Sequence, residues 1–373
     1  MLVSRVRLTD YRSYPSVDIA LEPGVTTLVG ANGQGKTNLV EAIGYAATLS
    51  SHRVATDAPL VREGAQRAVI GVDAVRDDRD VLVEIEITPG RANRGRLNRS
   101  PVTRVRDVLG VVRTVLFAPE DLALVKSDPS ERRRFLDEVL IQRAPRLQGV
   151  KSDYERVLKQ RNALLKSAAT ARRNAPDAMI ATLEVWDEQL AEAGAQLLQA
   201  RTALLVDLEP RVATAYAGIA GPDMPVQLEY ESSVATPVTP TAQEWKTSML
   251  EAISARRKDE LDRGVSLVGP HRDDVRISLE GRPARGFASH GESWSLALAL
   301  RLASLEVLRS DGDEPILILD DVFAELDSQR RRHLIEQVMQ SPQVLITAAV
   351  PADVPDEVGG QRLTVTRGRI ERG

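Results

Sequence analysis

The stretch GANGQGKT, Gly30 to Thr37, decides the fold of this 373-residue chain. It fits G-x-x-x-x-G-K-[ST], the pattern of a phosphate-binding P-loop, and stands between a predicted strand and a predicted helix. Glycines let backbone amides converge on phosphates at the positive end of the following helix. We expect Lys36 to reach the β- and γ-phosphates of ATP and Thr37 to ligate Mg²⁺. The predicted nucleotide-binding residues are Gly30, Ala31, Asn32, Gly33, Gln34, Gly35, Lys36, Thr37 and Asn38.

A second stretch, ILILDD, from Ile316 to Asp321, supplies the acidic partner of the P-loop. Four apolar residues predict a buried parallel strand whose carboxyl end delivers carboxylates beside the phosphates. We expect Asp320 to hold Mg²⁺, and Asp321 to orient or deprotonate the attacking water. A helix cap is the alternative explanation for an acid pair after a strand, and the P-loop weakens it.

The segment SHGE, Ser289 to Glu292, precedes a predicted amphipathic helix that starts near Glu292. In the order P-loop, helical insert, S-x-G-[QE] and acidic strand, these motifs look like the head of an ABC-type ATPase. In such heads the signature serine and glycine cap the γ-phosphate of ATP that a second subunit holds. By this resemblance Ser289, Gly291 and Glu292 bind nucleotide in trans, and Asp327, in AELD, forms the D-loop of the same interface. A simple helix cap is the alternative for Ser289.

Composition bounds the function classes. The chain is 43% hydrophobic and has no cysteine, which removes disulfides and thiolate metal sites. It has no long uncharged apolar run and no signal-like N-terminus, so we expect a cytoplasmic protein without membrane spans. The four histidines form no H-x-x-x-H pair, which argues against a metal hydrolase.

The net charge of −4 does not by itself indicate a nucleic-acid binder. Basic residues gather in clusters, however, and positive patches on an acidic protein can bind phosphate backbones. Each cluster taken singly is better explained as a solvated face, and only the whole set favours DNA. The clusters are Arg91, Arg94, Arg96 and Arg99; Arg132 to Arg134; Arg256 to Lys258; and Arg330 to Arg332.

The order of elements predicts an α/β fold in which one P-loop lobe is split by a helical insertion. We expect residues 1–122 to form the first part of the ATPase lobe and residues 301–373 the second part. Residues 123–300 would form the helical lobe, which ends in the signature segment.

The helical insertion from Pro129 to about Gly218 is rich in helix formers, with breaks expected at Pro145, Pro176 and Pro210. A heptad pattern predicts an antiparallel helical arm hinged near NAPDA. Two helices of a compact bundle explain the short repeat equally well. The heptad leucines are Leu183, Leu190, Leu197 and Leu204.

Nearly the whole chain resembles the RecF recombination mediators, in the SMC-like branch of ABC ATPases. The resemblance rests on segments more specific than the P-loop: DYRSY, SHR at 51–53, LFAPEDLALVKSDPSERRRFLD, GPHRDD at 269–274, ASHGESW and LILDDVFAELD. It implies that Arg12 approaches the nucleotide base or ribose and that Glu120 is a possible Mg²⁺ or water contact. His271 and Arg272 mark the family, and loop architecture explains them at least as well as catalysis.

The chain departs from the wider pattern of ABC ATPases in three motifs. Glu292 stands where many relatives have glutamine. Asp321 is shorter than the glutamate of transporter ATPases, and Ala348 and Ala349 occupy the place of the switch histidine. We expect slow hydrolysis, as suits a switch.

The resemblance implies an ATP-dependent homodimer that clamps DNA at junctions of duplex and single-strand gaps, with RecR and RecO as partners and RecA loading as the outcome. Such binding would be independent of base sequence and located at the nucleoid. Among the basic clusters we expect Arg132 to Arg134, with the helical arm, to contact DNA. An ABC transporter subunit and a P-loop kinase are the alternatives, although a kinase would leave SHGE and AELD without a role.

Overall fold

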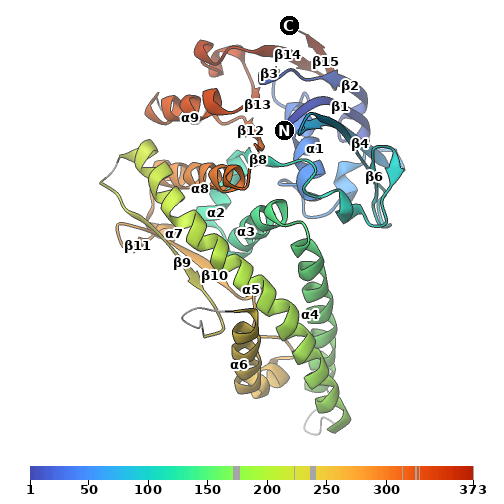
Figure 1. Cartoon of the computed structure of the whole chain (residues 1–373), viewed down its shortest axis with the longest axis vertical. Helices are drawn as coiled ribbons and strands as arrows, with labels where there is room; N and C mark the ends of the chain where they lie inside the picture. Colours follow the sequence, from blue (N-terminus) through green and yellow to red (C-terminus); the bar gives the residue numbers. More distant parts are fainter. Residues whose placement is uncertain are drawn as a thin grey trace. The chain divides into compact units, whose positions relative to one another are not determined.

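The computed structural model describes residues 1–170, 177–221, 223–235, 241–312, 314–323, 326 and 328–372. The chain divides into two units, whose elements Figure 1 traces. Unit 1 comprises Met1–Lys126, Arg211–Pro225 and Ala288–Gly373, and unit 2 comprises Ser127–Pro210 and Val226–Phe287. This division differs from the predicted one because the signature segment and the whole helix after it belong to unit 1.

The P-loop emerges from a six-stranded sheet in unit 1 with the order β15-β14-β3-β13-β12-β8. Its five strands from β14 to β8 are parallel, and β15 pairs antiparallel with β14. Parallel neighbours place their carboxyl ends at one edge, where ligands bind in such sheets. The strands are β3 Gly24–Val29, β8 Thr114–Phe117, β12 Ile316–Asp320, β13 Gln343–Ala348, β14 Gln361–Thr366 and β15 Arg369–Arg372.

A second sheet of unit 1 is antiparallel throughout and has the order β2-β1-β4-β5-β6-β7. Val6 and Leu8 of β1 are buried two residues apart, as expected for a strand with one face on the core, and an irregular register between Val3 and Arg5 interrupts the alternation. The strands are β1 Leu2–Tyr11, β2 Tyr14–Ala20, β4 Ala68–Arg76, β5 Arg79–Ile87, β6 Arg94–Leu97 and β7 Ser100–Pro101.

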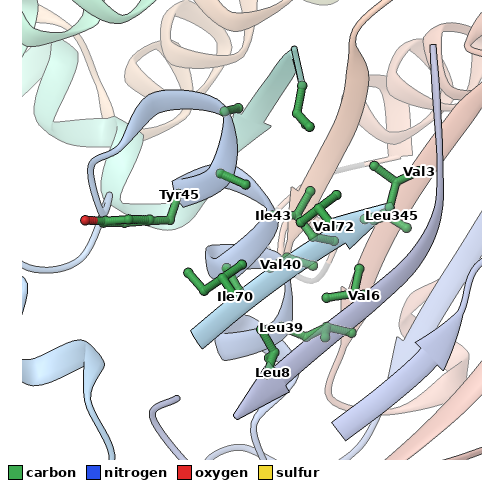
Figure 2. Packing of buried hydrophobic residues seen from close by; sticks show 14 of the residues in the cluster. Val3, Val6, Leu8, Leu39, Val40, Ile43, Tyr45, Ile70, Val72 and Leu345 are labelled. Carbon is green, nitrogen blue, oxygen red and sulfur yellow. The ribbon is translucent and has the colours of Figure 1, made fainter. Parts of the chain in front are cut away.

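Helix α1, Lys36–Thr48, joins these two sheets through one hydrophobic core (Figure 2). Its residues Leu39, Val40 and Ile43 are fully buried. They pack with residues of β1 and β4 from the antiparallel sheet and with Leu345 of β13 from the parallel sheet. Because packing on two sheets fixes the position of α1, it also fixes the P-loop that precedes the helix.

Helix α8, His290–Ser310, carries the signature segment and is buried on nearly every face after its first turn. The prediction of an amphipathic helix is therefore wrong: α2, Leu122–Lys126, and strand β8 cover the faces expected to be exposed. Trp294 packs edge-on against Phe117 of β8, with ring centroids 5.6 Å apart. Unit 1 also contains α9, Ser328–Gln340.

Unit 2 is built on helices with a small antiparallel sheet of order β11-β10-β9. Side chains of α4, α5 and α6 form one buried cluster, so the heptad leucines Leu190 and Leu197 face a three-helix core. The compact-bundle alternative thus describes this region better than an isolated arm. The elements are α3 Pro129–Arg143, α4 Leu147–Thr170, α5 Asp177–Ala220, β9 Val226–Glu231, α6 Ala242–Arg263, β10 Asp274–Leu279, β11 Arg282–Pro283 and α7 Ala284–Phe287. The part of α5 from Arg211 onward belongs to unit 1.

The break expected at Pro210 is wrong, because α5 continues through this residue to Ala220. A proline inside a helix leaves one carbonyl of the preceding turn without its amide partner. Pro210 lies on an exposed face, where water can satisfy that carbonyl, and its neighbours Leu208 and Val212 are fully buried. Packing on both sides of the proline therefore holds the helix. The hinge predicted near NAPDA falls on residues 171–176, outside the described residues.

No helix in the described part of the chain combines the length and apolar character needed to cross a membrane.

Candidate nucleotide site

The P-loop is open to an anion at the start of α1. Gly33 and Gly35 adopt positive φ of 80° and 115°, backbone conformations that glycine reaches without steric cost. Gly35 is the N-cap of α1 and offers no side chain, and no acid lies in the first helical turn. No carboxylate of its own first turn therefore competes for the first amides of α1, which leaves the positive end of the helix available to a phosphate.

Lys36 is buried and folds back over the loop. Its Nζ donates to the carbonyl of Gly30 at 2.7 Å and lies 3.5 Å from the carbonyl of Ala31. The Oδ1 atom of Asp321 is 4.0 Å from the same nitrogen. The ammonium group is thus held at the mouth of the P-loop by weak acceptors, which phosphate oxygens can replace.

Asp320 lies at the end of β12 and collects hydroxyl groups from two other elements. Its Oδ1 accepts from Thr37 Oγ1 of α1 at 3.0 Å and from Thr347 Oγ1 of β13 at 2.5 Å. The acidic strand therefore places Asp320 beside the P-loop, as predicted. Thr347 was not predicted, because a threonine in a buried strand gives no local signal of its role.

Burial raises the pKa of Asp320 to about 6. Hydrogen bonds from Thr347 and Thr37 oppose this rise, while the charges of Asp321 and Glu120 add to it. An ionised carboxylate is costly in this position without a cation. The electrostatics of the site therefore favour a bound cation or a bound proton.

Thr37 and Asp320 present hard oxygen atoms to the same point, which is the chemistry that Mg²⁺ prefers. In the described part of the chain, no three His, Asp or Glu side chains converge as a metal site. Mg²⁺ usually binds through one or two protein oxygens together with substrate phosphates and water. The residues present therefore fit Mg²⁺ that arrives with a nucleotide.

Asp321 follows β12 with a left-handed backbone, φ 50°, which is uncommon for a residue other than glycine. Its amide donates to Thr347 Oγ1 at 2.9 Å, so the threonine that binds Asp320 also fixes the direction of Asp321. Its side chain remains 35% exposed. A constrained carboxylate with access to solvent can orient a water molecule, which is the predicted role of Asp321.

A cavity of about 160 Å³ lies beside Asp321. Ala348 and Ala349, at the place of the switch histidine, both line it, so this wall has methyl groups and no imidazole. Asp353, which was not predicted as a site residue, also lines the cavity. The remaining lining residues are Asn32, Pro119, Phe323 and Thr347.

Arg12 makes a bidentate ion pair with Glu41 of α1, at 2.6 and 2.8 Å. Glu41 is fully buried and also accepts from Ser51 Oγ at 2.5 Å. Arg53 lies 3.7 Å from the same carboxylate and donates to Asn38 Oδ1 at 2.9 Å. The segments DYRSY and SHR therefore meet at α1, and the expected contact of Arg12 with a base or ribose stays a prediction.

Glu120 is exposed in the short turn Pro119–Asp121, and its charge acts on Asp320. Asp121, the next residue, has a structural role. It is buried and accepts hydrogen bonds from two nitrogens of Arg301 in α8, at 2.6 and 3.0 Å. The APED segment thus anchors the signature helix beside β8. A role of Glu120 toward Mg²⁺ or water stays a prediction.

Ser289 and Glu292 form a reciprocal capping box at the start of α8. Ser289 Oγ accepts from the amide of Glu292 at 3.3 Å, and the amide of Ser289 donates to Glu292 Oε2 at 2.6 Å. Both carboxyl and hydroxyl are therefore engaged locally, and the box is exposed. No hydrogen bond within the described residues joins this segment to the P-loop of its own chain. Ser289 therefore caps its own helix. Its contact with the nucleotide of a second copy stays a prediction.

Gly291 of the signature segment allows a close approach by α9. A Cβ atom at this position would lie 2.9 Å from an Arg330 guanidinium nitrogen. Arg330 Nε also donates to Ser295 Oγ at 2.7 Å, so α9 supports the first turns of α8. The predicted D-loop residue Asp327 lies outside the described residues.

The GPHRDD segment is a structural hub of unit 2. Asp273 is buried and accepts from the amide and hydroxyl of Ser233 and from the hydroxyl of Tyr230. His271 Nδ1 is hydrogen-bonded to Tyr154 OH at 2.6 Å, and burial lowers the pKa of His271 to about 4. Arg272 donates to the carbonyl of Ser266. Loop architecture therefore accounts for His271 and Arg272.

The arginines expected to contact DNA are occupied within unit 2. Arg132 is buried and makes two hydrogen bonds to Asp274, at 2.6 and 2.9 Å. Arg133 donates to the carbonyl of Asp273, and Arg134 pairs with two glutamates of its own helix. Arg132 and Arg133 thus help to pack α3 against β10, whereas Arg134 stays 42% exposed, and contact of this cluster with DNA stays a prediction.

The fold and the site define an SMC-like ATPase head. The model of the family "RecF/RecN/SMC N terminal domain" matches residues 2–356. The chain is 59% identical to the DNA replication and repair protein RecF of Frankia alni and 57% identical to that of Streptomyces avermitilis, over the full length of each. Within the SMC-like class, the chain therefore belongs to the RecF family of DNA replication and repair proteins.

Solved structures agree with this assignment. The recombination mediator protein RecF-ATP, described in the RecFOR pathway, matches with a TM-score of 0.91 and 25% identity, over 100% of this chain and 97% of that one. The Smc head domain of Pyrococcus furiosus matches with a TM-score of 0.55 and 16% identity, over 100% of this chain and 96% of that one, which supports the shared fold alone.

Proposed function

We propose that this protein is an ATP-switched clamp for DNA in recombinational repair and replication. Two copies would join through ATP, hold DNA where duplex meets a single-strand gap, and release it after hydrolysis. The relatives are replication and repair proteins, and the similar structure is of a RecF-ATP form. The expected partners are RecO- and RecR-type mediators, the expected outcome is RecA loading, and the expected location is the cytoplasm at the nucleoid.

The proposal rests on one observation: unit 1 contains two separate parts of a nucleotide site, each incomplete by itself. One is the P-loop with Lys36, Thr37 and Asp320, which can hold Mg²⁺ and phosphates. The other is the exposed capping box at Ser289, which has no hydrogen bond to that P-loop among the described residues. A helix N-terminus attracts phosphate. ATP bound to one copy can therefore be covered by the α8 terminus of another.

Slow hydrolysis follows from the residues around the attacking water. Asp321 is the expected base, and the cavity beside it is lined by Ala348 and Ala349 rather than by a histidine. Bound Mg²⁺ would neutralise phosphate charge, and Lys36 would stabilise charge that develops at the γ-phosphate. Loss of one donor that stabilises the transition state lowers the hydrolysis rate about 100-fold or more in comparable sites. Such slow hydrolysis fits a protein that uses ATP to switch between states.

For the DNA contact we favour the β5–β6–β7 edge of the antiparallel sheet. Arg91, Arg94, Arg96 and Arg99 are all exposed there. Arg94 and Arg96 stand opposite Glu86 and Glu84 across the strands, while Arg91 and Arg99 lie in the turns at either end of β6. Phosphate contacts of this kind are independent of base sequence and sensitive to salt.

The proposal is tested by fluorescence anisotropy on a gapped duplex, with light scattering on the same samples. ATP, ADP and nucleotide-free conditions are compared at fixed salt. We expect ATP alone to produce both a dimer and tighter DNA binding. Dimerisation by ATP without any effect on DNA would reject the clamp and leave a head that serves another partner. An absence of ATP binding would reject the site itself.

A further inference from the structure

We propose that the C-terminal β-hairpin, β14–β15, is a latch that positions the P-loop for phosphate, with Gln34 as the positioning residue. The latch is defined by Gln34 of the P-loop and by Arg367 and Gly368 of the hairpin turn. This inference rests on the proposed nucleotide function and adds to it a reason why the end of the chain controls a site near its start.

Two hydrogen bonds join the P-loop to the hairpin turn. The amide of Arg367 donates to Gln34 Oε1 at 2.7 Å, and the amide of Gly368 donates to the carbonyl of Gln34 at 3.1 Å. Arg367 adopts a left-handed backbone, φ 46°, followed by Gly368 at φ 73°. The turn thereby points two successive amides at one residue of the P-loop.

Close backbone approaches surround these bonds. A Cβ atom on Gly30 would lie 2.3 Å from the carbonyl oxygen of Val365, so strand β14 touches the loop where it leaves β3. A Cβ atom on Gly368 would lie 2.7 Å from the carbonyl oxygen of Ser13, in the β1–β2 turn. Packing against β14 therefore explains why the first glycine of the P-loop is a glycine.

The β1–β2 turn and the start of β2 also hold the P-loop in place. Tyr14 is fully buried and its hydroxyl donates to the carbonyl of Gly35 at 2.9 Å. Ser13 Oγ accepts from Asn38 Nδ2 at 2.9 Å. The hairpin turn rests on this β1–β2 turn, and both turns hold the P-loop.

The energetic reason for a latch lies in the glycines of the loop. Gly33 and Gly35 give the backbone many conformations when it is free, and ordering it on binding would cost conformational entropy. Contacts that hold the loop in its binding shape beforehand reduce that cost. None of the latch contacts uses the amides at the start of α1, so the loop is held without blocking its phosphate-binding groups.

The test compares three variants of the full chain. Gln34→Ala removes the side-chain acceptor. Gly368→Ala drives a methyl group into Ser13 and strains a positive φ. Gly281→Ala is the matched control. Gly281 has φ 74°, and no atom of the described residues lies within 4 Å of the place where a Cβ would stand, so the substitution brings similar backbone strain without the collision.

The first readout is hydrogen exchange in nucleotide-free protein. We expect Gln34→Ala to speed exchange in residues 363–370, and Gly368→Ala to speed exchange in residues 30–38, each at least fivefold. Gly281→Ala should change neither segment. Exchange confined to the segment that carries each substitution would overturn the latch, whether or not the protein binds nucleotide.

The second readout is the affinity for a fluorescent ATP analogue with Mg²⁺, together with kcat and KM. We expect about tenfold weaker binding and a raised KM for both latch variants. For Gly368→Ala, which lies outside the P-loop, kcat at saturation should stay within twofold of the parent. Equal affinities for Gly368→Ala and Gly281→Ala would show that the hairpin is structural only. If the parent protein itself binds no ATP, the proposed function fails, and the exchange experiment still decides the latch.

Discussion

At the scale of single residues, the chemistry of the site depends on atoms that serve two partners. Thr347 Oγ1 donates to Asp320 and accepts from the amide of Asp321, so one hydroxyl orients both carboxylates. Lys36 is held by main-chain carbonyls of its own loop. The acids and the lysine were predictable because their motifs are local, whereas Thr347 is known only from its contacts.

Replacing Lys36 tests whether charge or shape matters in the P-loop. Lys36→Arg keeps the positive charge, so nucleotide should still bind. The guanidinium is larger and planar and cannot occupy the buried position of Nζ, so we expect kcat to fall about 100-fold. Equilibrium binding and phosphate release measured on one preparation check both parts. Hydrolysis within a few fold of the parent would show that Nζ is not needed in the transition state.

Asp320 predicts a pH dependence of nucleotide binding. Its pKa is raised to about 6 from an ordinary 3.8, so between these values the folded, nucleotide-free protein holds a proton that the unfolded chain has released. Stability of the nucleotide-free protein therefore falls as pH rises through that window. Mg²⁺ needs the ionised carboxylate, so affinity for Mg·ATP should be about tenfold weaker at about pH 5 than at about pH 7.

Calorimetric titration across this pH range measures the effect. The same titration with a chelator in place of Mg²⁺ is the control, and it should lack the step. A flat profile with Mg²⁺ present would contradict the assignment of Asp320 as the ligand.

At the scale of elements, two helices begin with the same capping box and have different surroundings. Thr241 and Glu244 cap α6, and Ser289 and Glu292 cap α8. Both boxes have the same two reciprocal hydrogen bonds, so capping alone cannot separate a structural terminus from a binding one. What differs is the context: the α8 terminus belongs to the unit with the P-loop, and Gly291 permits the approach of Arg330.

The two boxes provide a matched pair of variants. Either Ser289→Arg or Thr241→Arg removes a cap, which should cost about 1 kcal/mol of stability. Only Ser289→Arg should abolish dimerisation with ATP, because it places a bulky side chain where the phosphate of another copy is expected. ATP binding by the monomer should survive in both. Light scattering with ATP that shows a normal Ser289→Arg dimer would refute the role in trans.

The three-helix core of unit 2 contains a fully buried arginine. Arg161 donates to Asp187 at 2.7 Å and to Glu260 at 2.5 Å, and Arg257 makes a further contact with Asp187. Arg161→Met would leave Glu260 buried without its cation. Breaking a buried ion pair from one side costs about 3–5 kcal/mol.

Urea unfolding followed by circular dichroism measures this cost. The control is Arg156→Met on the same helix, because Arg156 is exposed and pairs with Asp153 in solvent. Such a surface pair contributes about 0–1 kcal/mol. Equal losses for the two variants would mean that the buried network adds nothing to stability.

At the scale of the whole molecule, the net charge of −4 conceals an uneven distribution of arginines. Some arginines, such as Arg132, Arg161 and Arg201, are buried in ion pairs. Others are exposed along the β5–β6–β7 edge. Charge counts along the sequence treat both groups alike, and only burial separates structural arginines from those free to meet a phosphate backbone.

Reversing Arg91, Arg96 and Arg99 to glutamate tests the DNA surface. If each contacts a phosphate, the slope of log affinity against log salt should fall by about 0.9 per lost contact. The control reverses Arg256, Lys258 and Arg263 on α6, which changes the net charge by the same amount. Anisotropy across a salt series checks the result. A larger loss for the α6 variant would move the DNA contact to unit 2.

The sequence by itself determined the P-loop, the acidic strand, the signature segment and the family, because each is a short run of residues whose spacing carries its chemistry. The tertiary structure decided which arginines are buried, that Pro210 lies within a helix, and that α8 is covered on nearly all sides. It alone showed Gln34 bonded to Arg367, 333 residues away along the chain. Contacts between distant segments depend on how the sheets and helices pack, and no local pattern of residue types encodes that packing.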